Sequence, residues 1–435
     1  MTIQAKYKLK GSLKISGDKS ISHRSLIMGA MSIGHTEIHN LLESKDILST
    51  VSILRKLGVK IKKKQNSWVV SGVGTCGFKQ PNQVLNAGNS GTTSRLMFGA
   101  VSTNPILCTF TGDLSLSSRP MKRVTDLLKD VGAKIKLTNE NYLPLSIEGN
   151  INSLPLKHII TKPSAQIKSS IMLAALNISG QTTIIENQQT RDHTEILFKY
   201  LGINFKKEIY KNGKAKITVS GPAEIKAKNI DVASDPSSAA FFTVAALITP
   251  NSKITIKNVC LNKTRIAYIK VLKQMGGKIV IRKKNGKISG EIVGDIKVRY
   301  SSLNSIVISK KLAPYLIDEY PILAIAASQA KGVTTMKDLT ELRFKESDRL
   351  ISIHQNLLNS GIDSTIVKDD LIIKGSKDKI TGGNKIDSFH DHRIAMSFSI
   401  LNLICKKPLK INNLKCIDIS YPKFNQDLKS LLVNA

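Results

Sequence analysis

The stretch DPSSAAFFTVAAL, which begins at Asp235, decides the fold of this chain. Wound into a helix, it is apolar on nearly every side, so the helix must be buried rather than lie on a surface. Five further stretches share its pattern of an opening Ser or Asp followed by small and apolar residues. They are SISHRSLIMGAMS from Ser20, SGTTSRLMFGAVS from Ser90, SAQIKSSIMLAAL from Ser164, DEYPILAIAAS from Asp318 and DHRIAMSFSIL from Asp391. The sequence therefore predicts six buried helices.

A second sequence motif, an apolar residue followed four positions later by glycine, recurs at intervals of 70 to 85 residues. Each copy ends an amphipathic helical stretch, and alternating residues typical of half-buried strands follow it, as in AKIKLTNENYLPLSIEG. The glycines are Gly58, Gly132, Gly202, Gly276 and Gly361, and the helical stretch YPKFNQDLKSLL closes the chain. The repeating unit is thus a buried helix, a strand, a surface helix and two strands. Six copies predict an α/β protein of two domains with three copies each.

The charge of the chain has several possible explanations. Its 435 residues include 65 Lys and Arg against 32 Asp and Glu, a net charge of +33. This excess permits a nucleic-acid binder, an anionic-surface binder or an enzyme for anionic small molecules. Aromatic residues make up only 5% and Trp68 is the single tryptophan, which disfavours a stacking surface for nucleic acid. Much of the excess is expected on solvated faces.

Cysteine usage and hydropathy indicate the compartment. The five cysteines are scattered without a CxxC pair, which argues against disulfides and a zinc ribbon. No apolar run approaches a membrane span, and the first residues do not resemble a signal peptide. We therefore expect a cytoplasmic protein with no membrane partner.

The starts of the buried helices carry the candidate chemistry. Lys19, Ser20 and Arg24 lie within about one and a half helical turns, a set suited to phosphate or carboxylate. If the helix starts converge, their free N–H groups make a site that attracts anions. Asp348 and Asp391 are also expected to form structural ion pairs.

Six segments together resemble the EPSP synthase (3-phosphoshikimate 1-carboxyvinyltransferase) family of enolpyruvyl transferases. They are GDKSISHR, NAGNSGTTSRL, GDLSLSSRPM, PSAQIKSS, LRFKESDR and DHRIAMSF, and the resemblance runs from about Lys10 to Leu431. It implies two domains, each of three βαβαββ units around buried helices, an inside-out α/β barrel. The implied domains are residues 19–230 and residues 1–18 plus 231–435, joined by two crossover strands that act as hinges.

The resemblance also implies a reaction. The family joins phosphoenolpyruvate to the 5-hydroxyl of shikimate 3-phosphate and releases phosphate by addition and elimination through a tetrahedral ketal. No metal or organic cofactor is implied. The expected partners are these two small molecules, with no nucleic acid, and the expected state is a monomer.

Residue roles follow from the same resemblance. Asp318 matches the base that takes the proton of the 5-hydroxyl, Glu346 a proposed proton donor, and Lys19 a residue near both substrates. The implied contacts of shikimate 3-phosphate are Lys19, Ser20, Arg24, Ser164, Gln166, Thr190, Asp318 and Lys345. The implied contacts of phosphoenolpyruvate are Lys19, Asn89, Gly91, Arg119, Gln166, Arg349 and Arg393.

Three positions depart from the pattern of many relatives. Ile419 stands where a Lys is common, Glu341 where some have Asn, and Ala165 where some have a hydroxyl. The alternative is the sister transferase that acts on UDP-N-acetylglucosamine, which typically carries a Cys in the loop before Arg119. Here that loop, residues 114–118, reads LSLSS. The shikimate enzyme is therefore the better match.

Overall fold

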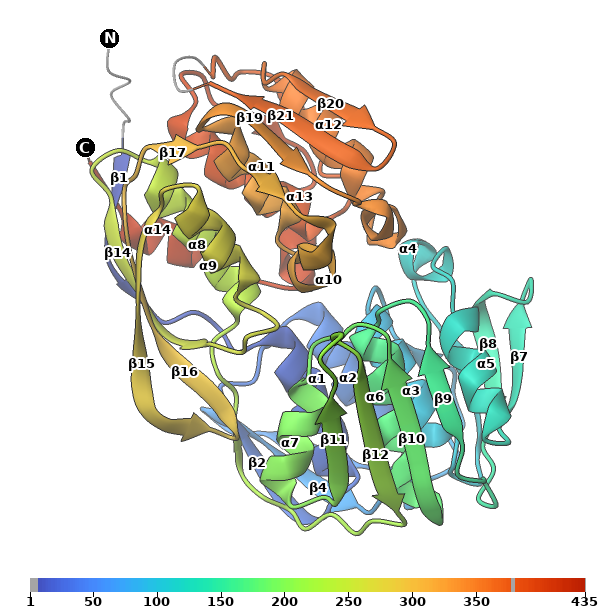
Figure 1. Ribbon diagram of the computed structural model, residues 1–435. Coiled ribbons are helices and arrows are strands. Elements are labelled where there is room, and N and C mark those ends of the chain that lie inside the picture. Colours follow the sequence, from blue (N-terminus) through green and yellow to red (C-terminus); the bar gives the residue numbers. More distant parts are fainter. Residues whose placement is uncertain (1–6, 377–379, 435) are drawn as a thin grey trace. The chain divides into compact units, whose positions relative to one another are not determined.

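All six predicted buried helices form, and a side chain caps five of them. The computed structural model describes residues 7–376 and 380–434 (Figure 1). Asp18, Ser90, Ser164, Asp235 and Asp391 each accept a backbone N–H at a helix start. The helices are α1 (Lys19–Ala30), α3 (Gly91–Val101), α6 (Ala165–Ala174), α8 (Pro236–Ile248), α11 (Tyr320–Ser328) and α13 (His392–Leu401). Nearly every residue of α8 and α11 is buried, as their composition predicts.

The described residues divide into two units. Unit 2 comprises Gly17–Val232 and Ile288–Glu291, and unit 1 comprises the rest. In unit 2, α3 packs against α1 and α6, and in unit 1 the helices α8, α11 and α13 pack against one another. The more exposed helices are α2 (Lys45–Lys56), α5 (Lys122–Asp130) and α7 (His193–Leu201) in unit 2, with α9 (Ala267–Gln274), α12 (Arg349–Asn359) and α14 (Phe424–Leu431) in unit 1.

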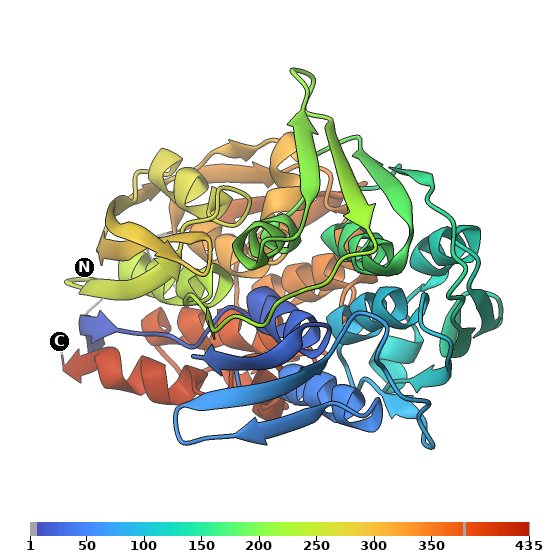
Figure 2. The ribbon, with the colours of Figure 1, turned by 90° about the horizontal axis from the view of Figure 1, so that it is seen from below.

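Three four-stranded sheets surround the buried helices of unit 2 (Figure 2). In each, a short strand pairs parallel to a longer one, and an antiparallel hairpin follows. In sheet order, the first is β13 (Ile230–Asp231), β2 (Ile33–His39), β4 (Ser67–Val73) and β3 (Lys60–Lys63). The second is β5 (Leu85–Asn86), β6 (Leu107–Thr111), β8 (Tyr142–Glu148) and β7 (Lys134–Thr138). The third is β9 (Lys157–Ile160), β10 (Gly180–Glu186), β12 (Ala215–Gly221) and β11 (Phe205–Ile209).

Unit 1 repeats this sheet order twice. One sheet is β17 (Leu303–Asn304), β19 (Ala330–Met336), β21 (Asp370–Gly375) and β20 (Ser364–Val367). The other is β1 (Tyr7–Leu13), β14 (Lys253–Cys260), β16 (Glu291–Arg299) and β15 (Lys278–Ile288), with β24 (Leu432–Asn434) added beside β1. The predicted α/β class is confirmed.

The sixth repeat is shorter than the other five. Its sheet contains, among the described residues, only β22 (Lys385–Ile386) and β23 (Lys410–Ile411). After α14 the chain forms the single strand β24, which pairs antiparallel with β1 instead of forming a hairpin. The predicted helical stretch YPKFNQDLKSLL forms α14, and the strand after it extends the sheet of β1.

The chain contributes a further short segment to unit 2. The sequence indicated crossings near residues 16–19 and 231–235, and the units divide after Ser16 and after Val232. Residues 288–291, at the turn between β15 and β16, also belong with unit 2. There the Ser289 hydroxyl accepts the Asp231 N–H at 2.8 Å, and Glu291 lies 2.6 Å from His193 Nδ1. No described helix is both long and apolar enough to cross a membrane.

Close approach of α3 and α6 gives a stability prediction. A Cβ added at Gly99 would lie 2.0 Å from the Ser170 carbonyl oxygen, so the two helices would have to separate. We expect Gly99→Ala to lower the free energy of unfolding by about 2 kcal/mol, even though Ala is the better helix former. Gly29→Ala in α1 is the matched control, because there the nearest atoms to the Cβ belong to side chains, Thr36 at 3.3 Å and Val70 at 3.5 Å. Urea unfolding of both variants measures the difference, and equal stabilities would contradict the prediction.

Candidate active site

In unit 2, the start of α1 places two cations differently. Lys19 pairs with Asp46 of α2, and its side chain keeps 18% of its surface exposed. Arg24 is buried and donates to the Thr194 hydroxyl at 2.7 Å, to the Ser169 hydroxyl at 2.7 Å and to a backbone carbonyl. Arg24 is thus fixed by its partners, whereas Lys19 remains open to solvent.

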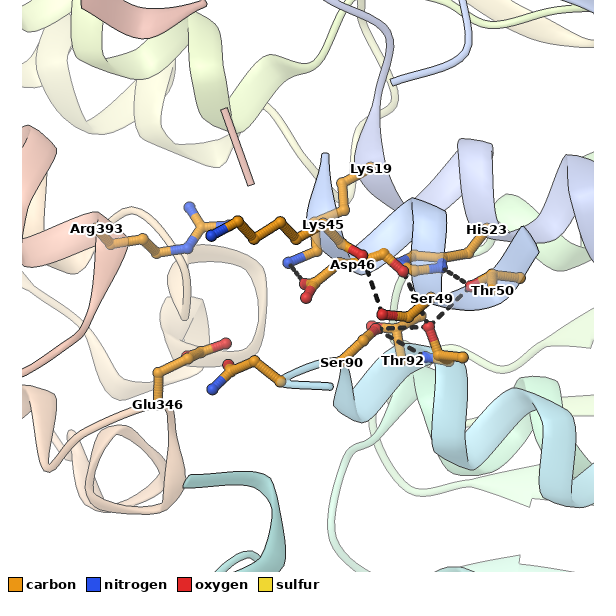
Figure 3. A network of polar contacts seen from close by, with 12 residues as sticks. Lys19, His23, Lys45, Asp46, Ser49, Thr50, Ser90, Thr92, Glu346 and Arg393 are labelled. Carbon is orange, nitrogen blue, oxygen red and sulfur yellow. Dashed lines mark hydrogen bonds and ion pairs between the residues drawn. The ribbon is translucent and has the colours of Figure 1, made fainter. Parts of the chain in front are cut away.

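A chain of hydroxyl groups connects α1 to the start of α3 (Figure 3). His23 Nδ1 lies 2.8 Å from the Thr50 hydroxyl, which lies 2.8 Å from the Thr93 hydroxyl. Thr93 donates to the Ser90 hydroxyl at 2.7 Å, and Ser90 caps α3. This chain fixes α1, α2 and α3 relative to one another.

Arg119 is oriented by contacts with the loop before α3 and with Ser115. The Arg119 guanidinium donates to Asn89 Oδ1 at 2.9 Å and to the Ser115 hydroxyl at 2.9 Å. A Cβ at Gly91 would lie 2.7 Å from Nη1 of Arg95 and 3.6 Å from Nη1 of Arg119, so the glycine leaves room for both guanidinium groups. The structure therefore brings together the predicted residues Asn89, Gly91 and Arg119.

The start of α6 is connected to the same helix. Gln166 accepts from Arg95 at 2.9 Å and donates to the Thr92 hydroxyl at 2.8 Å. Ser164 caps α6 through the N–H of Ile167. In unit 2 the starts of α3 and α6 are thus joined by side chains.

In unit 1, Arg349 lies at the centre of three carboxylates. Its side chain is fully buried and contacts Asp391 at 2.7 Å, Asp318 at 3.3 Å and Glu346. Burial alone lowers the pKa of Arg349, but the three carboxylates outweigh that effect and raise it above its ordinary value. The guanidinium therefore stays charged and holds Asp318 and Glu346 in one place.

Arg393 provides a second cation beside Asp318. Its Nη1 donates to the Asp318 carbonyl at 3.0 Å, and its Nε lies 3.6 Å from the Asp318 carboxylate. Lys345 is half-buried and precedes Glu346 in the chain. The expected structural ion pairs are present, since Asp391 binds Arg349 and Asp348 binds Arg343 at 2.9 Å.

Several residues of these clusters were not predicted. The set comprises Asp46, Arg95, Ser169, Glu186 and Thr194. Two of them had a signal, since Arg95 lies in the quoted segment NAGNSGTTSRL and Ser169 in the quoted segment PSAQIKSS. The structure also shows that the Thr190 hydroxyl donates to the Glu186 carboxylate.

Comparison with known proteins identifies the family. The profile described as EPSP synthase (3-phosphoshikimate 1-carboxyvinyltransferase) matches residues 3–428. The chain belongs to the EPSP synthase family. A curated relative from Petrotoga mobilis, named 3-phosphoshikimate 1-carboxyvinyltransferase, is 44% identical over 422 residues, which is 96% of each chain. The EPSP synthase structure from Acinetobacter baumannii has a TM-score of 0.86 and 38% identity, and the match covers 99% of this chain and 97% of that one.

Membership of the EPSP synthase family decides between the alternatives. The UDP-N-acetylglucosamine transferase and the nucleic-acid binder are not favoured, because the profile and the relatives cover essentially the whole chain. The enolpyruvyl transferase NikO of Streptomyces tendae has a TM-score of 0.76 at 16% identity and covers 100% of this chain and 98% of its own. That likeness shows the shared fold alone.

The buried histidine of α1 gives a pH prediction. Burial, with Lys19 and Arg24 nearby, holds the pKa of His23 well below its ordinary value of 6.5. The unfolded chain thus binds a proton near pH 6.5 that the folded protein does not, so the free energy of unfolding falls as the pH is lowered. Between pH 6.5 and 5 we expect the free energy of unfolding of the wild type to fall by up to about 1.4 kcal/mol per pH unit more than that of His23→Asn.

Urea unfolding of both proteins at several pH values tests this difference. Asn can still bond to Thr50 but does not titrate. His158 and His354, whose pKa values burial also lowers, titrate in both proteins and cancel. If the free energy of unfolding changed with pH equally in the two proteins, the prediction would be contradicted.

Proposed function

We propose that this chain transfers the enolpyruvyl group of phosphoenolpyruvate to the 5-hydroxyl of shikimate 3-phosphate and releases phosphate. The observation that carries the proposal is the Arg349 cluster, which holds Asp318 and Glu346 beside a second cation, Arg393. Membership of the EPSP synthase family supports it. The chain thus acts in the shikimate pathway, which leads to aromatic amino acids.

Each substrate carries a phosphate and a carboxylate, so positive groups are needed to offset their repulsion. For shikimate 3-phosphate we assign Lys19, Ser20, Arg24, Ser164, Gln166, Thr190, Asp318 and Lys345. For phosphoenolpyruvate we assign Lys19, Asn89, Gly91, Arg119, Gln166, Arg349 and Arg393. The contacts of Arg119 with Asn89 and of Gln166 with Arg95 support these sets, since each keeps donors in fixed positions.

Asp318 is the proposed base. Its carboxylate lies 3.3 Å from Arg349 and 3.6 Å from Arg393, and the two cations stabilise its negative charge. It accepts the proton of the 5-hydroxyl as that oxygen forms a bond to C2 of phosphoenolpyruvate. Glu346 enters this step in its protonated form and donates that proton to C3 in the same addition, which gives the tetrahedral ketal.

Elimination completes the reaction. The C–O bond to phosphate breaks, Glu346 takes a proton back from C3, and the enol ether forms again. The proton held by Asp318 passes to the departing phosphate, which returns both carboxyl groups to their starting states. Cations near the phosphate, with Lys19 foremost among them, stabilise the charge that develops on it. Positioning and electrostatics therefore supply the catalysis, without a metal or organic cofactor.

The remaining assignments concern the whole chain. We assign it to the cytoplasm as a monomer. We propose domains of residues 19–230 and of 1–18 plus 231–435, and the division of the two units after Ser16 and after Val232 supports this assignment. Ile419 offers no charge where many relatives have Lys, so the other cations must carry phosphoenolpyruvate binding.

Phosphate release that requires both substrates tests the function. We expect Asp318→Ala to lower kcat by about 10²–10⁴-fold, because the base is lost. Lys19→Ala should lower kcat/KM by about 10²-fold or more, since a charged contact to both substrates is lost. Lys134→Ala is the control, because this exposed residue pairs only with Glu148 across β7 and β8 in the described contacts.

Circular dichroism verifies that each variant remains folded. Full activity of either site variant would contradict the assigned roles. Turnover with UDP-N-acetylglucosamine in place of shikimate 3-phosphate would contradict the proposed function itself.

A further inference from the structure

A buried lysine outside the assigned site neutralises two buried carboxylates. Lys168 of α6 has no exposed side-chain surface, and its ammonium lies 3.0 Å from Glu186 and 2.8 Å from Glu195. Both carboxylates are almost fully buried as well. Burial alone lowers the pKa of Lys168, but the two carboxylates outweigh that effect and raise it above its ordinary value. Lys168 is therefore charged at neutral pH.

The two carboxylates lie at the two ends of one loop. Glu186 ends β10 and Glu195 lies in the first turn of α7, so the loop between them carries Thr190. Glu186 accepts the hydroxyl of Thr190, which is an assigned contact of shikimate 3-phosphate. One cation thus fixes both ends of the loop.

The same arrangement reaches Arg24. Thr194 precedes Glu195 and accepts the Nε–H of Arg24 at 2.7 Å. Ser169, the neighbour of Lys168 in α6, lies 2.6 Å from the Thr194 hydroxyl and accepts from Arg24 at 2.7 Å. A shift of the start of α7 would therefore displace the partners that orient Arg24.

Removal of the lysine charge would leave two buried carboxylates close together. Lys207 of β11 is the other cation in the described contacts of this cluster, and it lies 3.4 Å from Glu195 and 3.1 Å from Asp192. It is in no described contact with Glu186. Because an unpaired buried charge is costly, the carboxylates would take up protons or move toward water, and the loop would move with them.

We propose that Lys168 is a positioning residue for shikimate 3-phosphate, which it serves by holding Thr190 and the partners of Arg24 in place. The inference rests on the proposed function. It predicts an effect on one substrate only, because the residues held are assigned to shikimate 3-phosphate and not to phosphoenolpyruvate.

Lys168→Met tests the inference, since Met keeps much of the volume and removes the charge. We expect KM for shikimate 3-phosphate, and its Kd by calorimetry without the second substrate, to rise roughly tenfold. KM for phosphoenolpyruvate and kcat at saturation should stay within about twofold. The matched control is Lys134→Met, which removes an exposed lysine and should leave all these constants unchanged.

Charge removal from the carboxylates provides a rescue. In the triple variant K168M/E186Q/E195Q no buried charge is left unpaired, and the amide oxygen introduced by E186Q can still accept the Thr190 hydroxyl. We expect KM for shikimate 3-phosphate to return to within about threefold of the wild type. If Lys168→Met does not fold, Glu186→Gln tests the inference in its place, because it conserves the side-chain volume. We expect it to raise KM for shikimate 3-phosphate about threefold.

The outcomes are distinct. A lower melting temperature with unchanged KM for shikimate 3-phosphate in both Lys168→Met and Glu186→Gln would overturn the inference. An equal rise of KM for both substrates would also overturn it. A wild-type protein without activity toward the two substrates would instead overturn the proposed function.

Discussion

Each unit depends on burying helices that are apolar on most sides. The flanks of such a helix offer little polar surface, but the N–H groups of its first turn still need partners. Side chains of Asp18, Ser90, Ser164, Asp235 and Asp391 supply them, at about 1 kcal/mol each. Polar groups in the interior are therefore concentrated at helix starts, and this is where the candidate chemistry lies.

The caps impose a second requirement. A buried carboxylate that caps a helix is stabilised further by a neighbouring cation. Asp391 is paired with Arg349, and Asp235 with Arg265 at 3.2 Å. Once Arg349 is fixed by a cap, its remaining N–H groups hold Asp318 and Glu346, so the same residue stabilises the helix start and arranges the proposed base and acid. In unit 1 the contacts of Arg349 thus both stabilise a buried helix start and position the proposed catalytic residues.

Much of the fold could be predicted from the sequence because its signals are local. Opening caps and glycine stops lie within a turn of the helices that they limit, and the predicted start at Ser20 falls one residue after the observed start of α1. The pairing of β24 with β1 could not be foreseen, because the two strands lie far apart in the sequence. Two of the three carboxylate partners of Arg349 lie 31 and 42 residues away, and the partner of His193 lies 98 residues away, beyond any periodic pattern. Motifs indicated which residues carry chemistry, but not which carboxylates hold them.

Burial separates the cations into two groups that differ in their access to solvent. Arg24, Lys168 and Arg349 are almost fully buried, and each already has at least two side-chain partners. Lys19 and Arg393 keep 18% and 12% of their side chains exposed, so a phosphate or carboxylate can approach them from solvent. A ligand at Lys19 has to compete with Asp46, and a dianionic phosphate is a stronger partner for an ammonium than a single carboxylate. The net charge of +33 is therefore a poor guide to function, because a few placed cations matter and the many exposed lysines, such as Lys60 and Lys62 on β3, do not.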